Sequence, residues 1–134
     1  MSFITIVDLE VFYRVGISEE ERAKPQRLLL TLDIKFDFSS AAVSGRIGRT
    51  IDYYEVTQRL LKLGETRSWR LIESVATDVA DKILSEFHPE NVTVEVKKFS
   101  IPEARYVSAN LTKQRPLPEN YKRPLWWQWW WQRW

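Results

Sequence analysis

The sequence predicts an α+β domain in which two helices cover one face of a four-stranded antiparallel sheet. Alternating apolar and polar residues indicate four strands, and apolar residues spaced three and four apart indicate two helices. These elements follow one another as strand, strand, helix, helix, strand, strand. With 134 residues, the chain is long enough for one such domain with its own core.

The first two strands are expected to form an antiparallel pair. Residues 3–12 are mostly β-branched, aromatic or otherwise apolar, and Gly16 follows at a predicted turn or bulge. Residues 28–38 alternate most clearly, with five apolar side chains on one side: Leu28, Leu30, Leu32, Ile34 and Phe36. The polar segment between the strands has room for at most one helical turn, because Pro25 cannot continue an interior helix.

The two helices are expected in the middle of the chain. After a connection of small residues and glycine at 39–49, Thr50 or Asp52 is positioned to cap the first helix, which ends near Gly64. Its apolar stripe consists of Tyr53, Val56, Leu60 and Leu63. The second helix is predicted over 72–87, where it is closed by Pro89.

The third strand ends in two lysines that face opposite sides. Val92, Val94 and Val96 alternate with polar residues, as in a strand with one buried face. Lys98 falls on the side of the valines, so a strand that includes it carries an ammonium group to the rim of the apolar face. In the alternative interpretation the strand stops at Lys97, and Lys98 extends into water.

A last strand is predicted over 105–113. The two helices leave the other face of the sheet without a cover, and the two edge strands remain open. Open edges favour pairing with another subunit. We therefore expect a cyclic homo-oligomer with its binding sites at the subunit interfaces.

Composition excludes several classes of function. Twenty basic against 18 acidic residues give a net charge of +2, which is not typical of a nucleic-acid-binding protein. The chain has no cysteine and a single histidine, His88, so neither a metal site nor thiol chemistry is expected. The N-terminus lacks the features of a signal peptide, and we expect a cytoplasmic protein.

Four sequence phrases resemble those of dihydroneopterin aldolases in order and spacing. They are Gly16-x4-Glu21-x4-Gln26, Thr50-Ile51-Asp52-Tyr53, Leu71-Ile72-Glu73-Ser74-Val75-Ala76 and Val94-x-Val96-x-Lys98. The resemblance covers about residues 3–113, which we interpret as one domain (1–113).

The resemblance implies the tunnelling fold, in which four ββααββ subunits close into a cyclic barrel, and two such rings often stack as an octamer. It also implies a cofactor-free reaction of folate biosynthesis. In that reaction 7,8-dihydroneopterin undergoes retro-aldol cleavage to 6-hydroxymethyl-7,8-dihydropterin and glycolaldehyde.

Glu73 is the residue that the resemblance implies as the pterin anchor. A carboxylate there can accept two N–H bonds from the guanidine-like edge of the pterin. In the alternative interpretation, Glu73 only complements the helix dipole. The neighbouring Ile72 is expected to contribute main-chain contacts to the ring.

Three further residues are expected to handle the side chain of the substrate. Lys98 is the expected general acid/base; a Schiff base is not needed, because the C=N bond of the dihydropterin accepts the electrons. Tyr53 is expected to order the hydroxyls or relay the proton, unless it only packs on the core. Glu21 is expected to meet the glycol tail from a neighbouring subunit or loop, unless it is only a solvated acid. Only the alignment of Gly16 and Gln26 distinguishes it from Glu19 and Glu20.

The chain departs from the family pattern at two places. Lys98 is followed by Phe99-Ser100-Ile101-Pro102 where Pro-Gly is usual, and Arg49 occupies a position that is usually acidic. A related activity, dihydroneopterin triphosphate 2′-epimerase, uses the same bond cleavage and is the alternative. Arg49 or Arg105 could then favour a phosphorylated tail.

Beyond residue 113 the composition changes. Residues 114–134 contain three prolines, typical of an extended linker, and then six of the seven tryptophans. A segment of tryptophan and arginine is suited to packing on the protein's own oligomer or to contacting a membrane interface or a partner protein. A further alternative is that this segment is an addition to the natural chain. A third hypothesis for the whole chain is a non-catalytic oligomeric scaffold that acts through this tail.

Overall fold

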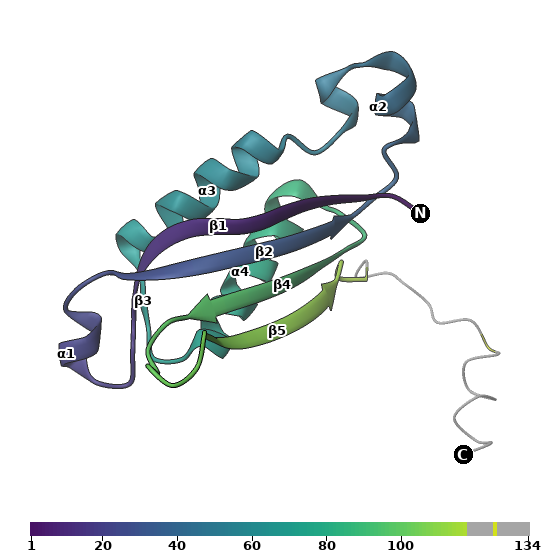
Figure 1. Ribbon diagram of the computed structural model, residues 1–134. Helices are drawn as coiled ribbons and strands as arrows, with labels where there is room; N and C mark the ends of the chain where they lie inside the picture. The colour runs from purple at the N-terminus through teal and green to yellow at the C-terminus, as the bar shows by residue number, and fades with distance from the viewer. Residues whose placement is uncertain (118–124, 126–134) are drawn as a thin grey trace.

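The computed structural model describes residues 1–117 and residue 125 (Figure 1). Within these residues ten elements follow one another: β1 (Phe3–Val15), α1 (Glu19–Arg22), β2 (Gln26–Lys35), α2 (Ser39–Ser44), η1 (Ile47–Arg49), α3 (Tyr53–Thr66), β3 (Ser68–Trp69), α4 (Ile72–Phe87), β4 (Asn91–Lys98) and β5 (Val107–Gln114). The predicted order of four strands and two long helices is therefore confirmed. The predicted tail lies almost entirely outside the described residues.

The strands form one sheet in the order β3-β1-β2-β4-β5. Along β1, β2, β4 and β5 each strand is antiparallel to its neighbour, as predicted. The sheet also has a fifth strand that the sequence did not indicate: β3 pairs in parallel with Arg14 and Val15 at the end of β1. A strand of two residues is too short to show an alternating pattern, which explains why it was missed.

The two long helices lie together on one face of the sheet (Figure 1). Helix α3 packs on β1, and α4 packs on β4 and β5. Apolar side chains of β1, β2 and β4 meet those of the helices in a single buried core. The largest fully buried members are Tyr13, Leu28, Leu30, Leu32, Ile34, Leu60 and Ile83. No helix of the described chain covers the other face, where Val7 and Phe12 are exposed.

A β-bulge explains the irregular pattern of β1. Its pairing with β2 shifts register between Ile6 and Leu9, and Asp8 adopts a left-handed conformation with φ of 53°. Ile6 and Leu9 are three residues apart, an odd spacing that would place them on opposite faces of a regular strand. The bulge instead keeps Ile4 and Ile6 on the same side as Leu9 and Val11.

Four elements differ from the sequence-based expectation in extent. β1 continues to Val15, β2 starts at Gln26 and ends at Lys35, α3 continues to Thr66, and β5 spans Val107–Gln114. The connection of small residues contains the short helix α2 and the 3-10 turn η1. Helix α4 has the predicted bounds and ends at His88 in a left-handed conformation, followed by Pro89. None of the helices in the described chain is long and apolar enough to cross a membrane.

Candidate active site

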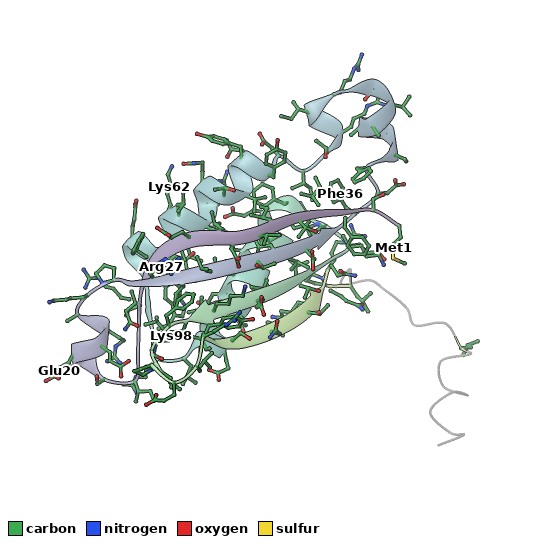
Figure 2. The ribbon with its side chains drawn as sticks, in the orientation of Figure 1. Met1, Glu20, Arg27, Phe36, Lys62 and Lys98 are labelled. Carbon is green, nitrogen blue, oxygen red and sulfur yellow. The ribbon has the colours of Figure 1, made fainter. Side chains whose placement is uncertain are left out.

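Several predicted site residues meet at one end of the sheet, which we call the α1 end. It is the end where β1 and β4 finish and where β2 and β5 begin. Figure 2 shows Lys98, Arg27 and Glu20 at this end, whereas Met1 and Phe36 lie at the opposite end, which we call the α2 end. Residues far apart in sequence therefore converge at the α1 end.

Lys98 is the last residue of β4 and pairs with Leu28 of β2 and Val107 of β5. Strand β4 does not stop at Lys97, so the alternative in which Lys98 lies beyond the strand is wrong. Because alternate residues share a face, Lys98 projects to the side of Val96, which the helices cover. Only 14% of its side chain is exposed. An ammonium group in such a position needs a partner.

Glu21 provides that partner. Its Oε2 lies 3.5 Å from Nζ of Lys98, and the two residues are 77 positions apart in the chain. Glu21 belongs to α1, whose first turn is capped by the Ser18 hydroxyl, which accepts a bond from the Glu21 amide at 3.2 Å. The Glu21 side chain remains 46% exposed, so a ligand can reach it. Neither Glu19 nor Glu20 is found paired with Lys98.

Glu73 and Ile72 lie at the start of α4, at the same end of the molecule. Strand β3 runs parallel to the end of β1, and the Gly16 amide donates to the Trp69 carbonyl at 3.0 Å. Helix α4 begins three residues later. Its N-cap residue, Leu71, makes no side-chain capping bond, and Glu73 is exposed. The first turn therefore presents a carboxylate and backbone N–H groups to a ligand.

Tyr53 is the one predicted site residue at the α2 end. It starts α3, which is capped by Asp52 and runs toward β3 over 14 residues. A helix of that length spans about 20 Å. Tyr53 is 63% exposed beside an apolar hollow lined by Ile4, Ile47, Thr50, Ile51, Asp52 and Tyr54. Within one chain, Tyr53 and Lys98 therefore do not meet.

Lys97 enters a separate network on the uncovered face. Its Nζ lies 2.9 Å from Oδ1 of Asp8 and 4.8 Å from the ring centre of Tyr106. The hydrogen bond from Lys97 lowers the pKa of the Asp8 carboxyl, and the same bond raises the pKa of the Lys97 ammonium. Two successive lysines are thus held by two different carboxylates, on opposite faces of the sheet.

Sequence reasoning did not single out the residues that hold α1. Arg14 and Arg22 donate to backbone carbonyls around the β1–α1 turn. Gln26, noted only as part of a motif, donates from Nε2 to the Val15 carbonyl at 2.7 Å and to the Glu21 carbonyl at 3.4 Å. Bonds to backbone carbonyls create no periodic pattern, so the sequence alone offered no signal for the two arginines.

Comparisons with known proteins point to one family. Residues 4–112 match the family model described as FolB, dihydroneopterin aldolase. A dihydroneopterin aldolase from Methylorubrum extorquens is 30% identical over 100 residues, which cover 74% of this chain and 77% of that protein.

Solved structures give the same result. A structure from Vibrio cholerae, assigned as a dihydroneopterin aldolase (FolB), has a TM-score of 0.82 and 28% identity, and covers 86% of this chain and 98% of its own. The dihydroneopterin aldolase of Escherichia coli in complex with neopterin has a TM-score of 0.80 at 23% identity. That match covers 84% of this chain and 99% of the Escherichia coli chain. These likenesses confirm the predicted α+β fold.

Proposed function

Because the chain belongs to the dihydroneopterin aldolase family, we propose that it is an aldehyde-lyase of folate biosynthesis that cleaves 7,8-dihydroneopterin. The products are 6-hydroxymethyl-7,8-dihydropterin and glycolaldehyde. The observation that carries the proposal is the pairing of Glu21 with Lys98 at the same end of the molecule as the exposed first turn of α4. Such a site combines a polar anchor for a flat heterocycle with a poised acid/base group.

Lys98 acts as the general acid/base in this proposal. The reaction breaks the bond between the first two carbons of the substrate side chain, and the hydroxyl on the second carbon loses its proton as the aldehyde forms. The bonding electrons enter the conjugated C=N bond of the dihydropterin, so no cofactor is needed. The first carbon is then protonated. Only 14% of the Lys98 side chain is exposed, so Lys98 can exchange these protons with the substrate away from bulk water.

Glu73 and Ile72 bind the pterin ring. The exposed Glu73 carboxylate accepts two N–H bonds from the ring's guanidine-like edge, which is a bidentate, charge-assisted arrangement. The backbone of Ile72 contributes main-chain contacts. Glu21, 3.5 Å from Lys98, meets the glycol tail next to the reacting hydroxyl.

Tyr53 reaches the reacting group from a second subunit. Its place at the α2 end of its own chain keeps it away from Lys98. The outer edge of β1 pairs with β3 only at Arg14 and Val15, so the rest of that edge is open. No strand of the described chain pairs with the outer edge of β5. Both edges are thus available for pairing with other copies. In the proposed cyclic tetramer, alone or stacked as an octamer, Tyr53 of one subunit completes the site of another.

The test is turnover of 7,8-dihydroneopterin by the purified full chain, followed by release of glycolaldehyde. A parallel incubation with the triphosphate, analysed for the 2′-epimer, distinguishes the aldolase from the epimerase. We place the enzyme in the cytoplasm, where folate precursors are made. Absence of both activities, together with absence of pterin binding, would support the scaffold hypothesis instead.

Two variants assign the roles. Lys98→Ala should retain pterin binding and lose turnover by about 100-fold or more, whereas Lys97→Ala, on the opposite face, should retain both. Glu73→Ala should lose binding. Glu55→Ala is its matched control, because Glu55 also lies in the first turn of a helix and tests the helix-dipole alternative. Unchanged turnover in Lys98→Ala would exclude the proposed acid/base.

A further inference from the structure

Helix α1 carries Glu21 but has no apolar anchor. It contains four residues, and none of them is buried. A single helical turn is not stable by itself, because nucleation costs more than one hydrogen bond returns. The position of the Glu21 carboxylate must therefore depend on polar contacts that tie α1 to the sheet.

Two arginines make these ties in opposite directions. Arg22, in α1, donates from Nη1 to the carbonyls of Gly16 and Ile17, both at 2.8 Å. Arg14, in β1, donates from its Nη1 to the carbonyl of Arg22 at 3.3 Å and to that of Ala23. Each guanidinium group bridges the end of β1 and the end of α1. Hydrogen bonds with a charged donor are among the stronger ones in proteins.

Gly16 connects this pair of arginines to the site. A Cβ at position 16 would lie 2.6 Å from Oε2 of Glu21, so the carboxylate packs directly on the Gly16 backbone. The Gly16 carbonyl accepts a hydrogen bond from Nη1 of Arg22, and the Gly16 amide donates one to the Trp69 carbonyl. Arg22 therefore fixes the surface on which the Glu21 side chain lies, and Glu21 in turn contacts Lys98.

We propose that Arg22 and Arg14 are positioning residues that hold α1 so that the Glu21 carboxylate stays over Gly16 and beside the Lys98 ammonium. This inference rests on the proposed aldolase function. In each arginine both bonds come from one nitrogen, Nη1, which is fixed in the guanidinium plane and lies one bond further from the backbone than the Nζ of a lysine. Arg22→Lys keeps the charge and loses this geometry.

Arg22→Lys should lower kcat for 7,8-dihydroneopterin by about 10- to 100-fold, because small displacements of a reacting group cost that much. It should leave unchanged the Kd for 6-hydroxymethylpterin, a ligand that has no glycol tail and depends on Glu73. Arg59→Lys is the matched control, since Arg59 pairs with Glu55 and Glu86 on the helix layer. A role in overall folding would alter both kcat and Kd.

A double-mutant cycle tests whether the arginine acts through Glu21. If it does, Arg22→Lys should cause little further loss of kcat in a protein that already carries Glu21→Gln. Arg14→Lys should behave in the same way. Losses that multiply in the double variants would overturn the proposal.

Amide hydrogen exchange of the full chain separates this inference from the proposed function. Arg22→Lys should accelerate exchange at residues 16–23 and leave β4 unchanged. Unaltered exchange at residues 16–23 would overturn the inference, whatever the activity. If the wild-type chain does not cleave dihydroneopterin, the aldolase proposal fails, and faster exchange in Arg22→Lys still supports the role of the arginines in holding α1.

Discussion

Two adjacent lysines at the end of β4 have different environments because successive strand residues face opposite sides of the sheet. Lys98 lies on the helix-covered side and pairs with Glu21 at 3.5 Å. Lys97 lies on the uncovered side, where it pairs with Asp8 at 2.9 Å. The alternation of Val92, Val94 and Val96 predicted which side Lys98 would take if the strand reached it, and the family resemblance singled it out. The Asp8 contact was not predictable, because it joins residues 89 positions apart and depends on the bulge.

The Asp8–Lys97 pair should make stability depend on pH at the acidic end. The bond from Lys97 lowers the pKa of Asp8 below its ordinary value of 3.8. The contribution of this carboxylate is therefore present above that value, and it is lost as the pH falls through the lower folded-state pKa. Asp8→Asn should flatten the fall in Tm between about pH 5 and pH 2.

Melting curves of the wild type and Asp8→Asn across this pH range provide the measurement. Glu10→Gln is a matched control, because Glu10 lies on the same strand in a more exposed pair with Arg27. An identical pH dependence of Tm in the wild type and Asp8→Asn would show that the pair does not contribute.

Strand β1 and helix α3 are fitted closely to each other. The Tyr13 ring is fully buried, and its hydroxyl donates to the Leu60 carbonyl at 2.6 Å. Burial raises the pKa of this phenol. Gly64, one turn further along α3, faces the same ring: a Cβ there would lie 2.8 Å from Cε1 of Tyr13. The helix needs glycine at this position for space rather than for backbone conformation.

Gly64→Ala should therefore destabilise the protein. In an open helix this change stabilises by about 1 kcal/mol. Here the added methyl group has to displace Tyr13, and overpacking of this kind costs about 1–3 kcal/mol. The free energy of unfolding in urea should fall accordingly. Gly48→Ala should be nearly neutral, because a Cβ at position 48 would have no atom within 4 Å; a gain in stability for Gly64→Ala would contradict the expected clash.

At the level of elements, the sequence predicted best where a long periodic pattern had clear ends. Helix α4 has the predicted limits because its apolar stripe is continuous and Pro89 closes it. Strand β3 and helix α2 were missed because each is too short for a pattern, and α2 buries no residue. Missing β3 affected the description of the site, because β3 determines where α4 begins and therefore where Glu73 lies.

At the scale of the whole molecule, Tyr53 and Lys98 lie at opposite ends of one chain. If each site combines the two residues from neighbouring subunits, inactive variants should complement one another. Co-refolding Lys98→Ala with Tyr53→Ala chains should restore part of the activity, because some interfaces then contain an intact Tyr53 and an intact Lys98. In an equal random mixture about one quarter of the sites recover.

The control for complementation is a mixture of Lys98→Ala with Glu73→Ala. Both residues are placed at the α1 end of the same chain, so every site in that mixture lacks one of them. Restored activity in this control, or none in the first mixture, would contradict the shared site. The sequence indicated open sheet edges but could not show that α3 separates the two residues.

The tail gives a second prediction at this scale. Arg115 is still tied to the domain, since its amide donates to the Glu90 carbonyl at 2.9 Å. A chain that ends at Arg115 should keep kcat/KM for dihydroneopterin, because all proposed site residues lie within the domain. It also retains Trp69 as its only tryptophan, which can report unfolding by fluorescence. Loss of turnover on truncation would contradict this prediction and would mean that the tail contributes to the active enzyme.

The extra residue in β1 uncouples the two halves of that strand. Without the bulge, the odd spacing between Ile6 and Leu9 would turn Ile4 and Ile6 away from the helices, while Val11, Tyr13 and Val15 kept their orientation. Deleting Val7 removes the extra residue and the odd spacing together, so every apolar side chain of β1 would stay on the helix side. A chain shortened at this point should therefore keep both the hollow beside Tyr53 and the lysine site.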